Sequence, residues 1–310
     1  MINIFPIIFF FIILNLSYFI ILKYFNYKEI KGIGFFISLI PLISLYINFE
    51  IQNTEYYLIF YTIMALSLIY LLDDLIDLNP FVRIFIQFIS GFIMLIFFFN
   101  LNDFLKYYFL ISIFLGFWNI FLTNVINFND GNDGNVGSLI LSLSICLLFY
   151  NFSYELNNYI VVYLVLFIII FLFFNFFFRK FYFGDSGCFT FSMIINYLLI
   201  IEIIINKNYL FLIFLFPLIF LSIDVIYVIL YRIIKGQDLL KRNYLHLYQQ
   251  IHIKYGGYYY LLINLFIPIV VVIVNNLLFP FYIDNIYYLF LINVSILTLF
   301  YFTVKYFLKL

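Results

Sequence analysis

Charged side chains are scarce in this sequence. Asp, Glu, Lys and Arg make up 10% of its 310 residues, whereas a soluble domain carries about 25% charged residues. This scarcity excludes water as the main solvent of the chain. The formal net charge is +0, so no overall electric field indicates nucleic acid as a partner.

Cysteine is scarce as well. Cys146 lies in an apolar run and Cys188 lies beside a polar loop, so the sequence does not indicate a disulfide framework, and we expect both thiols to be inert. The first apolar run is too long for a signal-peptide core and lacks a basic start and a small-residue cleavage site. We therefore expect it to be retained as a first membrane span.

Long apolar runs are the main feature of the sequence, and 67% of its residues are hydrophobic. Runs of about 17–25 apolar residues can cross a bilayer as helices, which satisfy their backbone polar groups internally. The runs are apolar on all faces, which excludes the alternating pattern of a barrel. We predict an all-α, polytopic transmembrane helical bundle that forms one domain over residues 1–310. The eleven spans are expected near 3–22, 33–49, 56–72, 81–99, 104–123, 137–153, 157–178, 187–205, 209–232, 258–279 and 286–307.

The basic residues predict the orientation of these spans. With the N-terminus outside, only Lys106 and Lys207 fall outside, and the other basic residues fall inside. The inner set is Lys23, Lys28, Lys31, Arg83, Arg179, Lys180, Arg232, Lys235, Lys241, Arg242, Lys254, Lys305 and Lys309. The positive-inside rule then places the C-terminus in the cytoplasm. Four polar elements that are far apart in the sequence should meet the same cytoplasmic face.

The first polar element ends the third span and contains Asp73, Asp74 and Asp77. If the helix continues to Asp77, the three carboxylates lie on about one face, where like charges repel and where nearby lipid makes them costly. A bound divalent cation or a lysine partner would offset both costs. The alternative is a solvated helix end.

The second polar element runs from Asn124 to Gly137 and contains Asn127, Asp130 and Asp133. Its two Asp-Gly pairs predict a loop, because glycine is a poor helix former. Glycine also lets backbone N–H groups approach a phosphate closely, and aspartate oxygens can hold Mg²⁺. The alternative is an ordinary Asn/Asp/Gly turn with no role in binding or catalysis.

The third polar element is Gly184-Asp185-Ser186-Gly187, and the fourth is the segment from Arg232 to Gln250. Taken alone, the third element is a common turn. It becomes a site candidate because it is expected at the same membrane face as the other elements. The basic residues of the fourth could anchor the loop to anionic headgroups. His246 could bind phosphate or a sugar, or it could cap a helix. Asp224 lies inside the ninth span, where a carboxylate indicates either function or a hydrogen bond between helices.

In this order, the four elements resemble the polyprenyl-phosphate N-acetylhexosamine-1-phosphate transferases of glycosyltransferase family 4, over residues 23–257. The pair Asp73-Asp74, followed by Arg83 and Gln87, resembles the first aspartate motif of the family. The most specific resemblance is that of residues 127–134, Asn-Phe-Asn-Asp-Gly-Asn-Asp-Gly, to the family signature Asn-Phe-x-Asp-Gly-x-Asp-Gly.

The other two motifs also have counterparts. Gly184-Asp185-Ser186-Gly187 resembles a Gly-Asp-x-Gly-Ser loop whose aspartate is a Mg²⁺ ligand, and His246-Leu247-Tyr248-Gln249 resembles the His-x-Tyr-Gln ending of an O-antigen-initiating branch. The chain departs from the family in a basic first loop reduced to 23–34, in Asn243 where a histidine is expected, and in Cys188 where a serine is expected. These departures bear on the sugar substrate more than on the reaction class.

The resemblance implies a multi-pass enzyme of the cytoplasmic membrane that transfers an N-acetylhexosamine 1-phosphate from a UDP-sugar to polyprenyl phosphate and releases UMP. It implies Mg²⁺, or Mn²⁺, held by Asp185 and Asp74. The implied catalytic residues are Asp73, Asp74, Asp130, Asp133 and His246. The implied substrate-binding residues are Asn124, Asn127, Arg83, Asp77, Tyr248, Gln249 and Lys241. The sequence is compatible with a homodimer.

Two other functions compete with this one. Asp73-Asp74-Leu75-Ile76-Asp77 also matches the Asp-Asp-x-x-Asp motif of membrane aromatic prenyltransferases, but that interpretation leaves Asp185 and His246 unexplained. A transporter would place its ionisable groups near the bilayer midplane, and Asp224 is the main residue that favours it.

Overall fold

A computed structural model describes residues 5–24, 30–47, 54–150, 152, 155–179, 181–238, 243–256, 258–281 and 286–309. Across these residues the chain is helical, and the β-structure among them is one isolated bridge between Ile30 and Phe181. This confirms the all-α prediction. The long Phe, Ile and Leu runs become helices because a helix pairs its own backbone groups where lipid offers no partner.

Within the described residues, nine helices are long and apolar enough to cross a membrane. They are Pro6–Tyr24, Thr54–Ile76, Pro80–Phe97, Leu101–Asn127, Glu155–Phe176, Gly184–Ile205, Phe211–Ile234, Tyr259–Leu278 and Ile286–Phe307. Two shorter apolar helices, Ile33–Ile47 and Asn135–Leu148, coincide with the second and sixth predicted spans. Each of the eleven predicted spans therefore overlaps an apolar helix, and the chain is a polytopic membrane protein.

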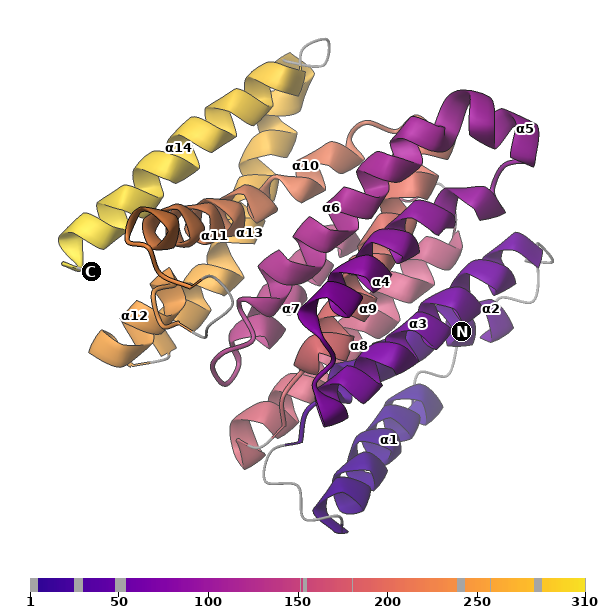
Figure 1. Cartoon of the computed structure of the whole chain (residues 1–310), viewed down its shortest axis with the longest axis horizontal. Coiled ribbons are helices and arrows are strands. Elements are labelled where there is room, and N and C mark those ends of the chain that lie inside the picture. The colour runs from indigo at the N-terminus through magenta and orange to yellow at the C-terminus, as the bar shows by residue number, and fades with distance from the viewer. Residues whose placement is uncertain are drawn as a thin grey trace. The chain divides into compact units, whose positions relative to one another are not determined.

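The chain divides into two compact units. Unit 1 consists of Met1–Asp130 and Asn151–Asn208, and unit 2 consists of Gly131–Tyr150 and Tyr209–Leu310. Unit 1 contains α1 (Phe5–Tyr24), η1 (Ile33–Ser38), α2 (Leu39–Ile47), α3 (Thr54–Ile76), α4 (Pro80–Ile93), η2 (Met94–Phe97), α5 (Leu101–Asp103), η3 (Phe104–Tyr108), α6 (Phe109–Asn127), α8 (Glu155–Phe178), α9 (Gly184–Leu199) and η4 (Ile200–Ile205). Unit 2 contains α7 (Asn135–Leu148), α10 (Phe211–Leu215), α11 (Pro217–Ile234), α12 (Leu247–Tyr255), α13 (Tyr258–Leu278), η5 (Phe279–Phe281) and α14 (Ile286–Phe307). Figure 1 shows these elements along the chain.

Helix α9 forms the centre of unit 1, where it packs against α3, α6 and η1. The ring of Phe189 on α9 stacks on Tyr70 of α3 with centroids 4.2 Å apart. The start of α9 also approaches η1 very closely, since a Cβ added to Gly34 would lie 2.4 Å from the Cα of Gly187. This packing fixes the first turn of α9 against the end of α3.

Helices α4 and α6 pack closely through glycine. A Cβ added to Gly91 would lie 2.4 Å from the Leu115 carbonyl oxygen, and one added to Gly116 would lie 2.7 Å from the Phe88 ring. Small residues allow such backbone approach between membrane helices, where polar side chains add interhelical hydrogen bonds. Here Asn119 Nδ2 donates to the carbonyl oxygen of Gln87 at 2.8 Å.

Unit 2 is built on α13, which packs against α7, and on α11, which packs against α14. Asn264 of α13 donates to the carbonyl oxygen of Asn135 at 3.1 Å. Asn275 and Asn293 exchange two side-chain hydrogen bonds, at 2.9 and 2.6 Å. Amides inside these apolar helices therefore join neighbouring helices to one another.

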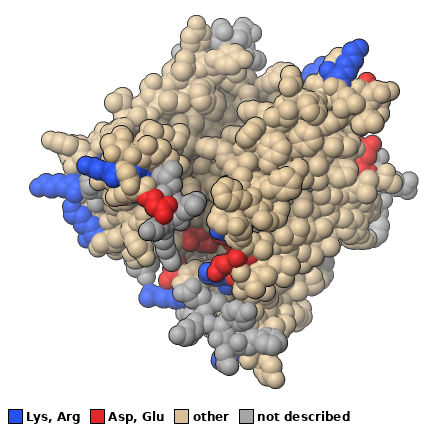
Figure 2. Space-filling view, in the orientation of Figure 1, with Lys and Arg blue, Asp and Glu red and all other residues tan. Residues whose placement is uncertain are grey.

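Most of the surface visible in Figure 2 carries neither acidic nor basic side chains. Large apolar side chains are exposed instead, among them Phe9, Leu110 and Phe114 at 65%, 76% and 62%. Exposed apolar surface of this extent marks contact with a membrane or a partner. It fits helices whose outer faces meet lipid.

Unit 1 has a second polar location at the opposite end of α3 from Asp73. A pocket of about 320 Å³ lies there, next to the start of α3 and the end of η4. Its lining residues are Glu55, Tyr56, Phe98, Phe99, Tyr108, Ile204, Ile205 and Lys207. Lys207, one of the two basic residues predicted to lie outside, is therefore at the opposite end of α3 from the aspartate pair.

Candidate active site

The aspartates of the first motif lie at the end of α3. The helix ends at Ile76, and the next residue, Asp77, is exposed with a left-handed φ of 48°. The side chain of Asp73 stabilises this end, because its Oδ1 accepts a hydrogen bond from Leu78 N at 2.6 Å. Asp77 therefore lies outside the helix, and the condition for three carboxylates on one helical face is not met.

Asp74 instead binds the first turn of α9. Its Oδ1 accepts from Asp185 N at 2.8 Å and its Oδ2 accepts from Ser186 N at 3.1 Å. Asp130 adds a third bond of this kind, because its Oδ2 accepts from Gly184 N at 2.9 Å. The first N–H groups of a helix have no partner within the helix and carry partial positive charge. Two carboxylates from distant motifs satisfy them here.

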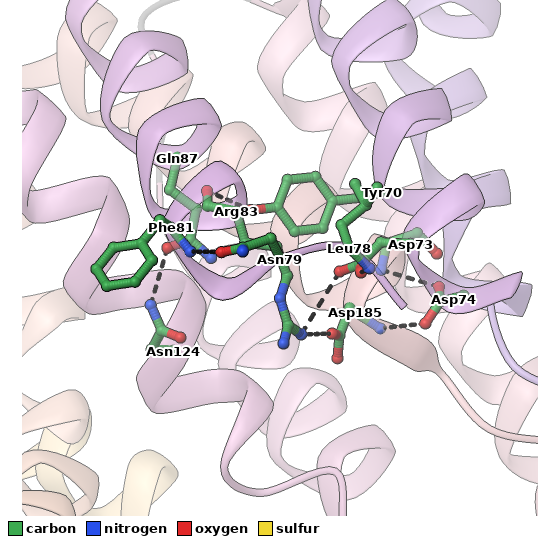
Figure 3. A network of polar contacts seen from close by, with 11 residues as sticks. Tyr70, Asp73, Asp74, Leu78, Asn79, Phe81, Arg83, Gln87, Asn124 and Asp185 are labelled. Carbon is green, nitrogen blue, oxygen red and sulfur yellow. Dashed lines mark hydrogen bonds and ion pairs between the residues drawn. The ribbon is translucent and has the colours of Figure 1, made fainter. Parts of the chain in front are cut away.

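Arg83 of α4 joins the first and third motifs, as Figure 3 shows. Its Nη1 lies 2.8 Å from Asp185 Oδ2 and 3.6 Å from Asp73 Oδ2. The side chains of Arg83 and Asp185 are 33% and 27% exposed, whereas that of Asp73 is 1% exposed. The side chains of Arg83 and Asp185 are thus the more accessible members of this group.

The position of Arg83 is set by its own helix. Asn79 caps the start of α4 by accepting from Phe81 N at 2.9 Å, and Pro80 occupies the first helical position. Both residue types favour a helix start. Tyr70 then donates to the carbonyl oxygen of Arg83 at 2.8 Å, which ties α4 to α3. No sequence pattern indicated the role of Tyr70.

Two asparagines of the second motif, Asn124 and Asn127, make hydrogen bonds within unit 1. Asn124 Nδ2 donates to Gln87 Oε1 at 2.9 Å, and both residues appear in Figure 3. Asn127 is half-buried, and its carbonyl oxygen accepts from Asp130 N at 2.9 Å, which closes the turn after α6. Unit 1 therefore brings together Asp73, Asp74, Arg83, Asp130 and Asp185.

The remaining predicted residues belong to unit 2. Asp133 is half-buried in the turn before α7. Tyr248 lies against the same turn, because a Cβ added to Gly131 would come within 2.2 Å of its hydroxyl oxygen. The second and fourth motifs thus meet within this unit.

His246 is the N-cap of α12, and its ring is buried. Its Nδ1 lies 2.9 Å from Asp224 Oδ2, and its backbone N donates to Gln249 Oε1 at 3.3 Å. The rings of His246 and Tyr248 are stacked with centroids 6.2 Å apart. Lys241 lies outside the described residues.

The expected metal ligands, Asp185 and Asp74, both belong to unit 1. Among the described residues, no three His, Cys, Asp or Glu side chains form a group that could hold a metal ion. The donor chemistry nevertheless fits a hard divalent cation, which prefers carboxylate oxygens. Asp73 Oδ2 is buried and accepts no hydrogen bond, and it shares the nearby Arg83 nitrogen with Asp185.

Residues 56–203 match the model of glycosyl transferase family 4. The match covers just under half of the chain and includes every predicted residue of the first three motifs. The fourth motif, with His246 and Tyr248, lies beyond it. No curated protein matches the chain. The match supports the family resemblance, and a glycosyltransferase as the class of enzyme, but it does not extend to the O-antigen-initiating branch.

Proposed function

We propose that this protein transfers an N-acetylhexosamine 1-phosphate from a UDP-sugar to polyprenyl phosphate, releases UMP and starts lipid-linked glycan assembly. The observation that carries the proposal is the joining of three motifs at the first turn of α9, where Asp74 and Asp130 accept its N–H groups and Arg83 pairs with Asp185. The family match includes all four of these residues.

The proposed reaction requires little covalent chemistry from the protein itself. An oxygen of the lipid phosphate attacks the phosphorus next to the sugar, the bond between the two phosphates of the nucleotide sugar breaks, and UMP leaves. Positioning and charge neutralisation supply most of the catalysis in such transfers. Arg83 can neutralise a phosphate, and Asp73 or Asp74 would orient the acceptor or take its proton. A phosphate monoester has a second pKa of about 6, so little proton transfer is required.

The metal proposal concerns Mg²⁺, or Mn²⁺, on Asp185 together with Asp74 or Asp73. When bound, the ion would neutralise charge on the diphosphate of the donor. The donor oxygens suit such an ion, and the buried Asp73 Oδ2 without a hydrogen bond is a position where a cation would lower the cost of burial.

The remaining predicted residues would bind substrate or act on it. We propose that Asn124, Asn127, Asp77 and Lys241 contact the nucleotide sugar or the lipid phosphate. Asp133, His246, Tyr248 and Gln249 would act from the turn before α7 and the start of α12. The polyprenyl tail would lie among the membrane helices, with its phosphate at the cytoplasmic face of the cell membrane.

The prenyltransferase alternative gains less support. An Asp-Asp-x-x-Asp motif acts through carboxylates on consecutive turns of one helix, whereas α3 ends at Ile76 and Asp77 has a left-handed backbone.

The test is product analysis with purified protein, a panel of UDP-sugars, polyprenyl phosphate and Mg²⁺. We expect UMP from at least one UDP-sugar, none in excess chelator, and recovery when Mg²⁺ or Mn²⁺ is restored. Asp185→Asn should abolish UMP formation while the protein stays folded in detergent. Asp103→Asn is the matched control, because Asp103 is exposed and its carboxylate contacts Asn100, the N-cap of α5.

The outcome that contradicts the proposal is specific. If pyrophosphate forms from a prenyl diphosphate and an aromatic acceptor, and no UDP-sugar yields UMP, the protein is a prenyltransferase. Full activity of Asp185→Asn would remove Asp185 from the metal site.

A further inference from the structure

Asp224 makes three polar contacts inside unit 2. Its Oδ2 lies 2.9 Å from His246 Nδ1, while its Oδ1 accepts from Leu247 N at 3.0 Å and from the Tyr301 hydroxyl at 2.8 Å. The side chains of Asp224 and His246 are 7% and 6% exposed. These contacts join α11, the start of α12 and α14 around one carboxylate.

We propose that Asp224 is a positioning residue that fixes His246 in one tautomer, with the proton on Nδ1 and the lone pair on Nε2. A carboxylate oxygen can only accept a hydrogen bond, so the nitrogen beside it must carry the hydrogen. The partner of one ring nitrogen therefore decides the state of the other. In its neutral form, His246 then presents Nε2 as an acceptor.

The two oxygens of the Asp224 carboxylate have different partners. Oδ1 serves the backbone of α12 and the hydroxyl of Tyr301 on α14, whereas Oδ2 faces the imidazole. A change at Oδ2 alone would therefore alter the histidine and leave the helix contacts in place.

Asp224→Asn makes this change. The amide oxygen must stay in the Oδ1 position, because two donors face it there, and the NH₂ group must take the Oδ2 position. That group donates, so His246 Nδ1 has to accept, and the ring proton moves to Nε2. A similar exchange in the serine protease triad preserves the geometry and yields the wrong tautomer.

The tautomer can be observed directly, because the chain has two histidines, His246 and His252. Nitrogen NMR of protein made with isotope-labelled histidine, at a pH above the usual titration range of imidazole, distinguishes a protonated Nδ1 from a protonated Nε2. His252→Gln assigns the signals, since it leaves one histidine. His252 is exposed and lies outside the proposed site, so this variant should keep its activity.

We expect the Nδ1–H tautomer in the wild type and in Tyr301→Phe, and the Nε2–H tautomer in Asp224→Asn. The wild-type spectrum tests the proposal without any variant at Asp224, so a folding defect in Asp224→Asn would not remove the test. An Nε2–H tautomer or a mixture in the wild type would overturn it, as would an unchanged spectrum in a folded Asp224→Asn protein.

The catalytic consequence rests on the proposed function. We expect Asp224→Asn to lower kcat for UMP formation at least about tenfold, with KM for the UDP-sugar changed by less than about threefold. A wild-type kcat in this variant would overturn the positioning role. If the tautomer switches as expected but the wild type forms UMP from no UDP-sugar, the proposed function fails and the assignment of the tautomer stands.

Discussion

At the residue scale, Gly184 occupies a position that has no space for a side chain. Its φ is +80°, and an added Cβ would lie 2.6 and 2.8 Å from the two oxygens of Asp74 and 2.5 Å from Gly32 N. The left-handed backbone alone costs other residues about 1–2 kcal/mol. We predict that Gly184→Ala destabilises the protein by more than that and abolishes transferase activity, as measured by unfolding in detergent and by UMP release.

Gly236→Ala provides the control for this prediction. Gly236 also has a positive φ, +63°, but a Cβ added there would meet nothing within 4 Å. This variant should therefore show the backbone cost alone and keep its activity. Equal destabilisation of the two variants would mean that the carboxylate of Asp74 moves aside easily.

Asp74→Asn tests the cap on α9. An amide has one oxygen and one NH₂ group, so it can accept from only one of the two N–H groups that Asp74 now satisfies. A buried donor left without a partner costs about 1–3 kcal/mol. We expect a loss of stability near the lower end of that range, because Asp74 is half-buried, and a loss of UMP formation. Stability equal to that of Asp103→Asn would show that the cap contributes nothing.

At the element scale, the helices could be predicted from the sequence, but several of their ends could not. Apolar runs identify a span because lipid requires an unbroken helix. The end of α3 depends instead on Asp73, which binds Leu78 N five residues later and ends the helix before Asp77. The hydrogen-bond partners of Asp74 and Asp224 could not be predicted either. Ser186, Leu247 and Tyr301 reach these carboxylates only after distant segments have folded together.

The asparagine pair between α13 and α14 should stabilise unit 2. Asn275 and Asn293 are buried and exchange two hydrogen bonds. Such bonds between membrane helices contribute about 0.6 kcal/mol on average and up to roughly 1.7 kcal/mol. We predict a coupling energy in this range from the variants Asn275→Leu, Asn293→Leu and their combination, measured by unfolding in mixed micelles. Asn276→Leu is the control, because Asn276 is exposed on the same helix. Additive effects of the two changes would contradict the prediction.

At the scale of the whole molecule, the division into two units was not visible in the sequence. Unit 2 combines α7 with the helices after residue 208, and Asn264 of α13 binds Asn135 at the start of α7. No composition shift or linker marks the boundaries, and the second motif contains one of them, between Asp130 and Gly131. Long-range pairing of similar apolar helices creates the units, and local patterns do not report such pairing.

The orientation in the membrane is a prediction for the whole chain that exposed lysines can test. Helix α3 has 23 residues, about 34 Å at 1.5 Å per residue, which is enough to separate its two ends by a bilayer. Lys31 is exposed beside Gly32, which lies at the Asp74 end, and Lys207 is exposed beside the pocket at the Glu55 end.

In intact cells, Lys207→Cys should react with a membrane-impermeant thiol reagent, and Lys31→Cys should react only after the cells are opened. The native thiols should give little background, because Cys146 and Cys188 are buried. The predicted orientation requires this result, because it places Lys31 and Arg83 inside and Lys207 outside. The reverse pattern would place the carboxylates of the candidate site outside, away from any cytosolic nucleotide sugar, and would contradict both the predicted orientation and the proposed reaction.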